Sequence, residues 1–391
     1  MKKNFDICIV GGLGHVGLPL GIVFASKGFK VCLQDINKDS AEIVKKGSMP
    51  FVEYGAEPLL KKALEEGNLS ISLSPESISQ SKHVIICLGT PIDEFMNPKT
   101  KQFIDFIDST KQYLDPSQTI IIRSSVAPRT CEQVLRTLGK GDWKLSYCPE
   151  RIVQGYAVQE LEKLPQIVSG FSEEAVESAS DLFKKISSTI IKTTMDEAEM
   201  AKLFSNSWRY LQFAMANQFY MICEDLGIDY DKVRFAMVDG YERASQIPSA
   251  GFAAGPCLLK DTMQISSIYN NGFLLGHSAM MINEGLPNYL VSKLRSKYDL
   301  KDKLVGILGM AFKANVDDIR DSLSFKLLKI LKFHGAKVLC SDEFVSNPEF
   351  VTKEEVLDTC DIVIIGTPHD QYKNLKVKDS CEVIDLWNIV V

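Results

Sequence analysis

The sequence predicts an α/β protein in which two Rossmann-like, doubly wound domains are joined by a central all-α domain with one long helix. Three observations carry this prediction. An apolar strand and a glycine-rich turn open the chain at 7–17, a similar strand and turn recur at 303–313, and a proline-free helical pattern covers 194–226. A chain of 391 residues suggests two or three domains. We expect them at 1–193, 194–299 and 300–391.

The composition limits the kind of protein. The formal net charge of −6 argues against nucleic acid as the main partner. Ten cysteines are spread singly without a Cys-x-x-Cys pair, so we expect reduced intracellular thiols and no metal site. The opening segment 1–5 leads straight into the first strand, and no apolar stretch has the length of a signal peptide or a membrane span. We therefore expect a cytoplasmic protein with no nucleic-acid or membrane partner.

The first glycine-rich turn follows a strand at 7–10 and opens a helix at 18–26. It has the pattern Gly-x-Gly-x-x-Gly, which is weak alone but specific between a strand and a helix. Such a turn lets a pyrophosphate approach the backbone at a helix N-terminus, where the dipole favours an anion. We expect the cofactor phosphates at Gly12, Gly14, His15 and Val16.

A second strand at 30–34 ends in Asp35. An acidic residue at this distance from the glycines accepts the adenosine ribose hydroxyls, and its charge repels a 2′-phosphate. The sequence therefore predicts NAD rather than NADP as the cofactor.

Two further buried strands, at 83–88 and 119–123, end in small polar residues. Ligands of doubly wound sheets lie at the carboxyl ends of the strands, which makes Thr90 and Ser125 candidate cofactor or water contacts. For each residue the alternative interpretation, that its hydroxyl serves the local turn, is equally good.

The last ninety residues repeat the first ninety. Strand patterns at 303–309, 337–342 and 361–368 match those that begin the chain, but the second turn continues with Phe312 and Lys313 in place of its last glycine. These side chains block a dinucleotide and suit an aromatic base and a phosphate. We infer one half for NAD and one for a different nucleotide.

The middle of the chain is helical. Thr194 and Glu197 form a capping box, and Gly227 supplies the stop, which gives about 48 Å of helix. Most of this helix is apolar, but four polar residues share one face: Glu199, Lys202, Asn206 and Arg209. Two interpretations of this face are about equally good. It is an exposed stripe that lines a cleft, or it is merely a solvated stripe. Further helices are expected at 231–237, 258–269 and 278–298, the last interrupted near Gly285 and Pro287. A long apolar central helix also suggests a homodimer.

A cysteine follows the small-residue loop 251–256 at an expected helix start. Lys260 and Asp261 come three and four residues after Cys257, so all three share a helical face. A helix N-terminus and a nearby ammonium both favour a thiolate nucleophile. A lone cysteine is more often buried and inert, which we expect of the other nine.

Taken together, these motifs resemble the nucleotide-sugar 6-dehydrogenases, a family that oxidises UDP- and GDP-sugars, and most closely those acting on UDP-N-acetylhexosamines. The resemblance covers nearly the whole chain. It rests on five ordered motifs, namely the opening glycine turn, 148–151, 199–206, 255–261 and 311–322.

The resemblance implies a four-electron oxidation of a sugar C6 alcohol to a uronic acid, for surface polysaccharide precursors. It implies that Cys257 forms a thiohemiacetal and then a thioester, that Lys202 and Asn206 hold the oxyanion, and that Asp261 acts as base through a water. It assigns further contacts to five residues: Glu150, Arg151, Phe312 and Lys313 to substrate and Arg320 to cofactor. Arg243 is assigned to a substrate across a dimer interface.

The chain also departs from the family. His15 stands where Tyr is usual, and Gln154 stands where the UDP-glucose enzymes carry a Glu that assists hydrolysis. Enzymes that oxidise N-acetylated sugars also lack that Glu, so Gln154 weakens the glucose assignment more than the activity. Two alternatives remain: a two-electron β-hydroxyacid or sugar-phosphate dehydrogenase, and a non-catalytic NAD-binding scaffold.

Overall fold

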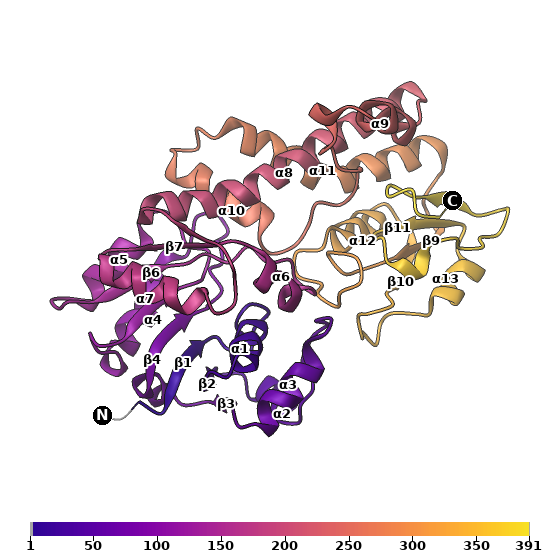
Figure 1. Ribbon diagram of the computed structural model, residues 1–391. Helices are drawn as coiled ribbons and strands as arrows, with labels where there is room; N and C mark the ends of the chain where they lie inside the picture. Colours follow the sequence, from indigo (N-terminus) through magenta and orange to yellow (C-terminus); the bar gives the residue numbers. More distant parts are fainter. Residues whose placement is uncertain (1–2, 391) are drawn as a thin grey trace. The chain divides into compact units, whose positions relative to one another are not determined.

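The computed structural model describes residues 3–390 (Figure 1). The chain divides into two compact units, Met1–Phe204 and Ser205–Val391. The boundary falls inside one continuous helix. The three-domain division at 193 and 299 stays a prediction, and its residues 1, 2 and 391 lie outside the described part.

The first unit is built on an eight-stranded sheet in which only the β6–β7 pair is antiparallel. The strands in spatial order are β3 (Leu69–Ser72), β2 (Val31–Gln34), β1 (Phe5–Val10), β4 (Ser81–Ile86), β5 (Thr119–Ile122), β6 (Lys144–Tyr147), β7 (Gln166–Gly170) and β8 (Ile190–Lys192). The four strands expected from the sequence are β1, β2, β4 and β5, and all four form. The doubly wound fold is confirmed.

Helices cover both faces of this sheet because its strands are apolar on both sides. On β1, Ile7 and Ile9 enter one core while Cys8 and Val10 enter the other. The first core also takes residues of α1 (Gly17–Ser26), α2 (Lys38–Lys45), α3 (Ala56–Glu65), α6 (Ala157–Lys163) and α7 (Glu173–Phe183). The second takes residues of α4 (Thr100–Thr110) and α5 (Thr130–Leu138).

The long helix α8 (Met195–Leu226) begins and ends as predicted. Glu197 Oε2 accepts from Thr194 N at 2.8 Å, and Thr194 Oγ1 accepts from Glu197 N at 3.4 Å, which completes the capping box. At the other end Gly227 has a φ of 68°, and Ile228 N donates to Cys223 O at 2.8 Å. This is the Schellman arrangement that a glycine allows.

On α8 most of the polar face is buried and several large apolar residues are exposed, which is the reverse of what the polarity of the sequence suggests. Glu199, Lys202 and Asn206 are 0%, 7% and 7% exposed, so the expected exposed stripe is wrong for three of its four members. Arg209 alone is exposed. The large apolar residues that remain exposed form a row, which we name the apolar stripe of α8: Phe204, Trp208, Met215, Ile222 and Leu226.

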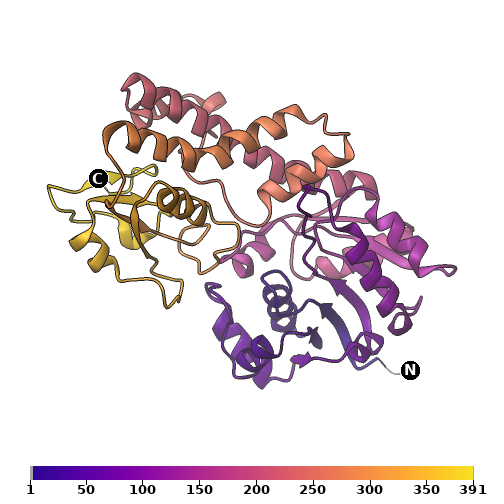
Figure 2. The same cartoon turned by 180° about the vertical axis from the view of Figure 1, so that it is seen from behind.

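The second unit contains the helices α9 (Tyr230–Val238), α10 (Leu258–Ile268) and α11 (Leu274–Lys297). The expected interruption of α11 at Gly285 and Pro287 is wrong, because the helix is continuous with Pro287 inside it and starts four residues earlier. In the view from behind, α8 in rose and α11 in orange lie side by side (Figure 2). Asn283 of α11 donates to Tyr210 O of α8 at 3.0 Å.

The C-terminal part carries a second parallel sheet, flanked by α12 (Leu323–Phe333) and α13 (Lys353–Thr359). Its strands in spatial order are β10 (Lys337–Ser341), β9 (Leu304–Leu308), β11 (Ile362–Ile365) and β12 (Glu382–Ile384). This order reproduces β2-β1-β4-β5 of the first sheet. The internal repeat inferred from the sequence is therefore present in the topology.

Within residues 3–390, no helix combines the length and the apolarity needed to cross a membrane. The same residues contain no group of three or more side chains that could hold a metal ion.

Candidate functional site

The turn between β1 and α1 brings bare backbone to the edge of the first sheet. Gly12 N donates to Gln34 O at 3.0 Å, and a Cβ on Gly12 would lie 2.7 Å from Ile9 O. Only glycine allows this approach between turn and strand. Gly14 is exposed, and a Cβ there would meet nothing closer than 3.6 Å, so the outer edge of the turn is open. Val16, at the N-cap of α1, cannot cap the first-turn amides through its side chain.

Asp35 lies beside this turn at the end of β2. Its carboxylate accepts from Leu13 N at 3.0 Å, Ile36 N at 2.8 Å and Asn37 N at 3.0 Å. A carboxylate accepts about four hydrogen bonds, so Asp35 keeps acceptor capacity for a ribose hydroxyl. Ile36, which the sequence analysis did not single out, is 87% exposed directly after it.

Thr90 and Ser125 meet at the carboxyl ends of β4 and β5, because the Thr90 hydroxyl donates to Ser125 O. Both residues are only partly exposed. The structure thus brings the two candidates together, and the Thr90 hydroxyl serves the neighbouring strand end rather than its own turn. Their contact with a cofactor stays a prediction.

The 148–151 segment is held by a buried ion pair that the sequence did not reveal. Arg123, at the end of β5, pairs with Glu150 and donates to Cys148 O at 2.9 Å. The other Glu150 oxygen accepts from Arg151 N at 2.7 Å and Ile152 N at 3.1 Å. Glu150 is therefore placed as an anchor of its own loop. The Arg151 guanidinium reaches back to a backbone carbonyl of the same unit, that of Pro165.

The two departures from the family pattern contact each other. Gln154 Nε2 lies 3.0 Å from His15 Nδ1, and the His15 ring lies 4.0 Å from the Phe51 ring, centroid to centroid. An amide and an imidazole nitrogen at this distance form a hydrogen bond. Gln154 thereby orients the one ionisable side chain of the glycine turn.

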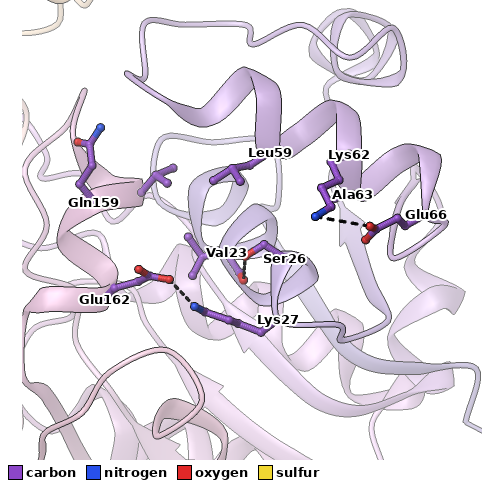
Figure 3. A pocket seen from close by; sticks show the side chains of 10 residues that line it. Val23, Ser26, Lys27, Leu59, Lys62, Ala63, Glu66, Gln159 and Glu162 are labelled. Carbon is purple, nitrogen blue, oxygen red and sulfur yellow. Dashed lines mark hydrogen bonds and ion pairs between the residues drawn. The ribbon is translucent and has the colours of Figure 1, made fainter.

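A separate pocket of about 400 Å³ lies in the first unit at the far end of α1 from the glycine turn (Figure 3). Val23, Leu59 and Ala63 line it, and Lys27 pairs with Glu162 at its rim at 2.6 Å. Charges of both signs surround this pocket, and none of the candidate residues lines it.

The polar face of α8 divides into an anchor and two candidates. Glu199 accepts from Arg129 N at 2.6 Å and Cys131 N at 3.0 Å, and so caps α5. Burial raises the pKa of Glu199, against the effect of these hydrogen bonds. Lys202 and Asn206 follow one turn apart on the same helix. An ammonium with 7% exposure is largely stripped of water and suits a partly negative group.

Cys257 is the N-cap residue of α10, and it is exposed, whereas seven of the ten cysteines are buried. Asp261 N donates to Cys257 O at 2.9 Å, so the carboxylate lies one turn below the thiol. Asp261 is fully buried. One of its oxygens accepts from Asn206 Nδ2 at 2.6 Å, and the other lies 2.7 Å from Lys260 Nζ as an ion pair. Lys260 thus pairs with Asp261, and the expected effect of its ammonium on the Cys257 thiol stays a prediction.

Two buried amides fix the start of the cysteine loop. Asn217 of α8 accepts from Gly251 N at 2.8 Å and donates to Gly251 O at 3.0 Å, as a neighbouring strand would. Asn217 also donates to Asn283 Oδ1 at 2.9 Å, and both amides are 0% exposed. A side chain at 251 would overlap the ring of Trp387. Asn217 was not predicted as a site residue, and its polarity within an apolar stretch of α8 was the available signal.

The end of the cysteine loop packs against the loop that carries Phe312. Gly255 has a φ of 100°, and a Cβ there would lie 2.5 Å from Phe312 Cδ2. Gly255 N also donates to Asp321 O at 3.3 Å. The structure thus brings together two motifs that lie more than fifty residues apart. Glycine is needed at 255, two residues before the cysteine, because an aromatic ring lies against it.

The three remaining basic candidates are Lys313, Arg320 and Arg243. Lys313 is partly exposed beside Phe312. The Arg320 guanidinium pairs with Asp318 at 2.6 Å, and this hydrogen bond raises the pKa of Arg320, to which the nearby Cys257 also contributes. Arg243, in a short 3-10 turn at Glu242–Ala244, is exposed and lies 5.1 Å from the Tyr241 ring centroid.

Comparison with known proteins decides the family. Three models of the UDP-glucose/GDP-mannose dehydrogenase family match the chain: the NAD binding domain at 5–187, the central domain at 196–284 and the UDP binding domain at 306–391. The chain belongs to the UDP-glucose/GDP-mannose dehydrogenase family.

Individual relatives agree with this membership. UDP-N-acetyl-D-mannosamine dehydrogenase of Methanocaldococcus jannaschii is 30% identical over 95% of this chain and 88% of its own length. The structure of UDP-D-ManNAc dehydrogenase from Pyrococcus horikoshii superposes with a TM-score of 0.91 at 27% identity, covering 99% of this chain and 96% of that one. A UDP-glucose dehydrogenase from Pyrobaculum islandicum gives 0.91 at 25% identity, covering 98% and 94%.

Family membership makes this chain an NAD-dependent nucleotide-sugar dehydrogenase and removes the scaffold alternative. The turn residues fit NAD on structural grounds, because an open Gly14, an uncapped α1 N-terminus and the remaining acceptor capacity of Asp35 match a pyrophosphate and a ribose diol. Relatives named for different sugars superpose equally well. The fold alone therefore leaves the sugar open.

Proposed function

We propose that this enzyme oxidises the C6 alcohol of a UDP-N-acetylhexosamine to the uronic acid, with two NAD consumed per substrate. The observation that carries the proposal is an exposed Cys257 at a helix N-terminus with a buried Asp261 one turn below it. A simple two-electron dehydrogenase needs neither residue. A four-electron enzyme needs a nucleophile that retains the aldehyde between its two oxidations.

In the proposed reaction the alcohol carbon first gives up a hydride while its hydroxyl gives up a proton to the base, and an aldehyde results. Cys257 then adds as thiolate to that carbon and forms a thiohemiacetal. A second two-electron oxidation gives the thioester, and water breaks the C–S bond to release the carboxylate and restore the thiolate. NAD bound to the first unit supplies the hydride acceptor for each oxidation.

Lys202 and Asn206 are proposed to hold the oxyanion of the thiohemiacetal. Asn206 gives one amide hydrogen to Asp261 at 2.6 Å, which leaves its second hydrogen for the substrate oxygen. Lys202, one helical turn away, adds a charged donor. A preorganised donor of this kind contributes roughly 3 kcal/mol to catalysis.

Asp261 is proposed to act as the base through a water, first for the alcohol and later for thioester hydrolysis. Its contacts with Asn206 and Lys260 also hold these two side chains in place, and Asn206 is one of the two proposed oxyanion donors. Gln154 cannot serve as a base. The hydrolysis step therefore depends on Asp261 more than in relatives that carry a Glu there.

The nucleotide is proposed to be UDP, bound by Phe312 and Lys313, with Arg151 and Arg243 as further substrate contacts. The UDP binding domain match and the names of the relatives support a UDP-sugar, and the absence of the hydrolytic Glu at 154 supports an N-acetylated one. The uronic acid product would serve surface polysaccharide synthesis. We propose a cytoplasmic location, which the unpaired cysteines and the use of NAD support.

The test is an NADH assay with UDP-N-acetylmannosamine, UDP-N-acetylglucosamine, UDP-glucose and GDP-mannose as alternative substrates. We expect turnover with an N-acetylated UDP-sugar and two NADH per molecule consumed. One NADH per molecule would replace the proposal with a two-electron dehydrogenase. Turnover confined to UDP-glucose or GDP-mannose would overturn the substrate assignment alone.

We also propose a homodimer formed through the apolar stripe of α8. Its five members are 52%, 56%, 43%, 47% and 67% exposed and recur four, seven, seven and four residues apart, which places them on one helical face. The stripe is about 33 Å long. An apolar row of this length on an exposed helix favours pairing with the same row of a second copy.

Light scattering after size exclusion tests the dimer with the double variant Trp208→Asp and Met215→Asp. We expect the wild type at twice the chain mass and the variant at one chain mass. Lys232→Glu, on exposed α9, is the matched control and should stay dimeric. A variant that remains dimeric would show that another surface pairs the subunits.

A further inference from the structure

The turn after β9 is closed by a carboxylate of its own chain. Asp342, at the end of β10, accepts from Met310 N at 2.6 Å and Ala311 N at 2.9 Å, and its other oxygen accepts from Phe344 N at 2.8 Å and Val345 N at 3.0 Å. The Asp342 side chain is 0% exposed. The turn amides that would bind a phosphate in a dinucleotide site are therefore already used.

His369 completes this arrangement and has a defined tautomer. Its Nδ1 lies 2.8 Å from Asn315 N, and its Nε2 lies 3.1 Å from Asp342 Oδ2. A backbone N–H can only donate, so Nδ1 carries the lone pair and the single ring proton lies on Nε2, which donates to Asp342. The imidazole in this arrangement is neutral, and it joins an amide to a carboxylate.

The ring of His369 has no freedom to turn. It is 0% exposed, with the Phe344 ring centroid 4.9 Å away and the Tyr372 ring centroid 5.3 Å away. Two ring contacts and two hydrogen bonds fix its position and its orientation. A ring that is fixed relative to the sheet also fixes the groups that are hydrogen-bonded to its two nitrogens.

The group that His369 holds is the far end of the loop 310–315. Asp342 fixes the near end at Met310 and Ala311, and His369 fixes the far end at Asn315 N. The Asn315 side chain adds bonds to Asp370 at 2.7 and 3.0 Å. Phe312 and Lys313 lie between the two anchors.

We propose that His369 is a positioning residue for nucleotide binding. As a neutral imidazole it connects Asn315 N to Asp342, and it thereby holds Phe312 and Lys313 where a base and a phosphate can meet them. The inference rests on the proposed function, which assigns those two side chains to the nucleotide. The turn after β9 corresponds to the dinucleotide-binding turn of the first sheet, but here it supports the loop 310–315.

Two substitutions separate the two hydrogen bonds of His369. His369→Asn retains an acceptor near the place of Nδ1 but loses the donor to Asp342. His369→Gln retains a donor near the place of Nε2 but removes the acceptor for Asn315 N. We expect His369→Gln to weaken UDP binding by about tenfold and His369→Asn by about threefold or less. His334→Gln, at the exposed end of α12, is the control.

Three measurements on the full-length enzyme decide the matter: UDP affinity by calorimetry, hydrogen exchange of the 310–316 peptide without ligand, and the KM for NAD. Faster exchange at 310–316 and weaker UDP binding in His369→Gln, with the KM for NAD unchanged, support the proposal. Unchanged exchange in that variant would overturn it. An equal rise of both KM values would also overturn it, because a merely structural role predicts that result.

The same experiment separates this inference from the proposed function. Faster exchange with unaltered UDP binding would keep His369 as the anchor of the loop and remove Phe312 and Lys313 from the nucleotide site. If His369→Gln does not fold, Asn315→Gly serves instead, since a φ of 58° suits glycine and the N–H to His369 remains. UDP affinity within about twofold of wild type supports His369 as the anchor. A tenfold loss would transfer that role to the Asn315 side chain.

Discussion

The two glycine turns of this protein occupy the same place in the same topology, yet they present different surfaces. After β1, Asp35 receives one turn amide, from Leu13, and remains partly exposed. After β9, Asp342 receives two turn amides and a histidine and is fully enclosed. The comparison shows that a carboxylate at the end of the second strand can leave the turn amides open or occupy them itself.

The difference follows from residues around the turns rather than from the strands. The tripeptides Gly89-Thr90-Pro91 and Gly366-Thr367-Pro368 follow equivalent strands, but the next residue is Ile92 in the first half and His369 in the second. An imidazole can bond to the aspartate and hold a loop, whereas an aliphatic side chain cannot. The first turn therefore stays open for NAD, and the second becomes a support. Because the two turns have different roles, each substitution should change the binding of one nucleotide and not of the other.

The largest effect on activity is expected from substitution of Cys257, which follows the loop that packs against Phe312. Cys257→Ser should lower net acid formation by about 10³-fold or more, because serine at this position is not ionised and forms no thioester. Binding of NAD and UDP should stay within about twofold, since neither turn is altered. NADH release and calorimetry measure the two quantities. Unchanged turnover would remove the covalent mechanism.

Lys202→Ala should lower kcat by about two orders of magnitude, because it removes a charged oxyanion donor. Both halves keep their ligands, so the KM values for NAD and the UDP-sugar should change little. Stopped-flow measurement of the first NADH formed locates the loss in the chemical steps. Lys232→Ala, on the exposed side of α9, is the control. A change confined to KM would make Lys202 a binding residue instead.

The first turn is tested by Asp35→Ser. Loss of the ribose acceptor should raise the KM for NAD by about tenfold and reduce the preference for NAD over NADP. UDP affinity should not change, because the proposed UDP site lies in the C-terminal part of the chain. Steady-state kinetics with both cofactors measures the effect. A wild-type enzyme that used NAD and NADP equally would show that Asp35 has another role.

The smallest effect concerns acid stability and the enclosed aspartate. Burial acts to raise the pKa of Asp342, but the hydrogen bonds from His369 and from the backbone amides of Phe344 and Ala311 outweigh it and leave that pKa lowered. A lowered carboxyl pKa stabilises the fold above the ordinary value of about 3.9 and loses that contribution as the pH falls towards the lowered value.

The expected slope from this single group is at most about 1.4 kcal/mol per pH unit. Urea unfolding of wild type and Asp342→Asn between about pH 3 and 7 measures it. The variant should be less stable throughout and less dependent on pH at the acid end. Parallel curves would show that Asp342 does not titrate differently in the folded chain.

Local patterns were enough to predict much of the fold. The strands β1, β2, β4 and β5, the internal repeat and both ends of α8 follow from residues close together in the chain: apolar runs, glycine turns and a capping box. The continuous α11 was missed, because Pro287 and Gly285 suggest a break that packing against α8 overrides. Strands β3, β6, β7, β8 and β12 were not predicted.

The candidate site was predicted in part. The motif around Cys257 and its relation to Asp261 follow from helical spacing, and the structure shows both in one turn of α10. Its supports were not predicted. Arg123 meets Glu150 twenty-seven residues away, Asn217 meets Gly251 thirty-four away, and His369 meets Asn315 fifty-four away. No periodicity connects residues at such separations.

What the amino-acid order determines alone is many of the elements and the chemistry they carry, because helix caps, glycine turns and strand patterns act over a few residues. Tertiary structure alone settles which side of each element is covered. On α8 it buries Glu199, Lys202 and Asn206 and leaves Trp208 exposed, the reverse of what polarity suggests. The physical reason is that a buried polar group is stable only when distant chain segments or a ligand supply its partners, and only folding brings those together.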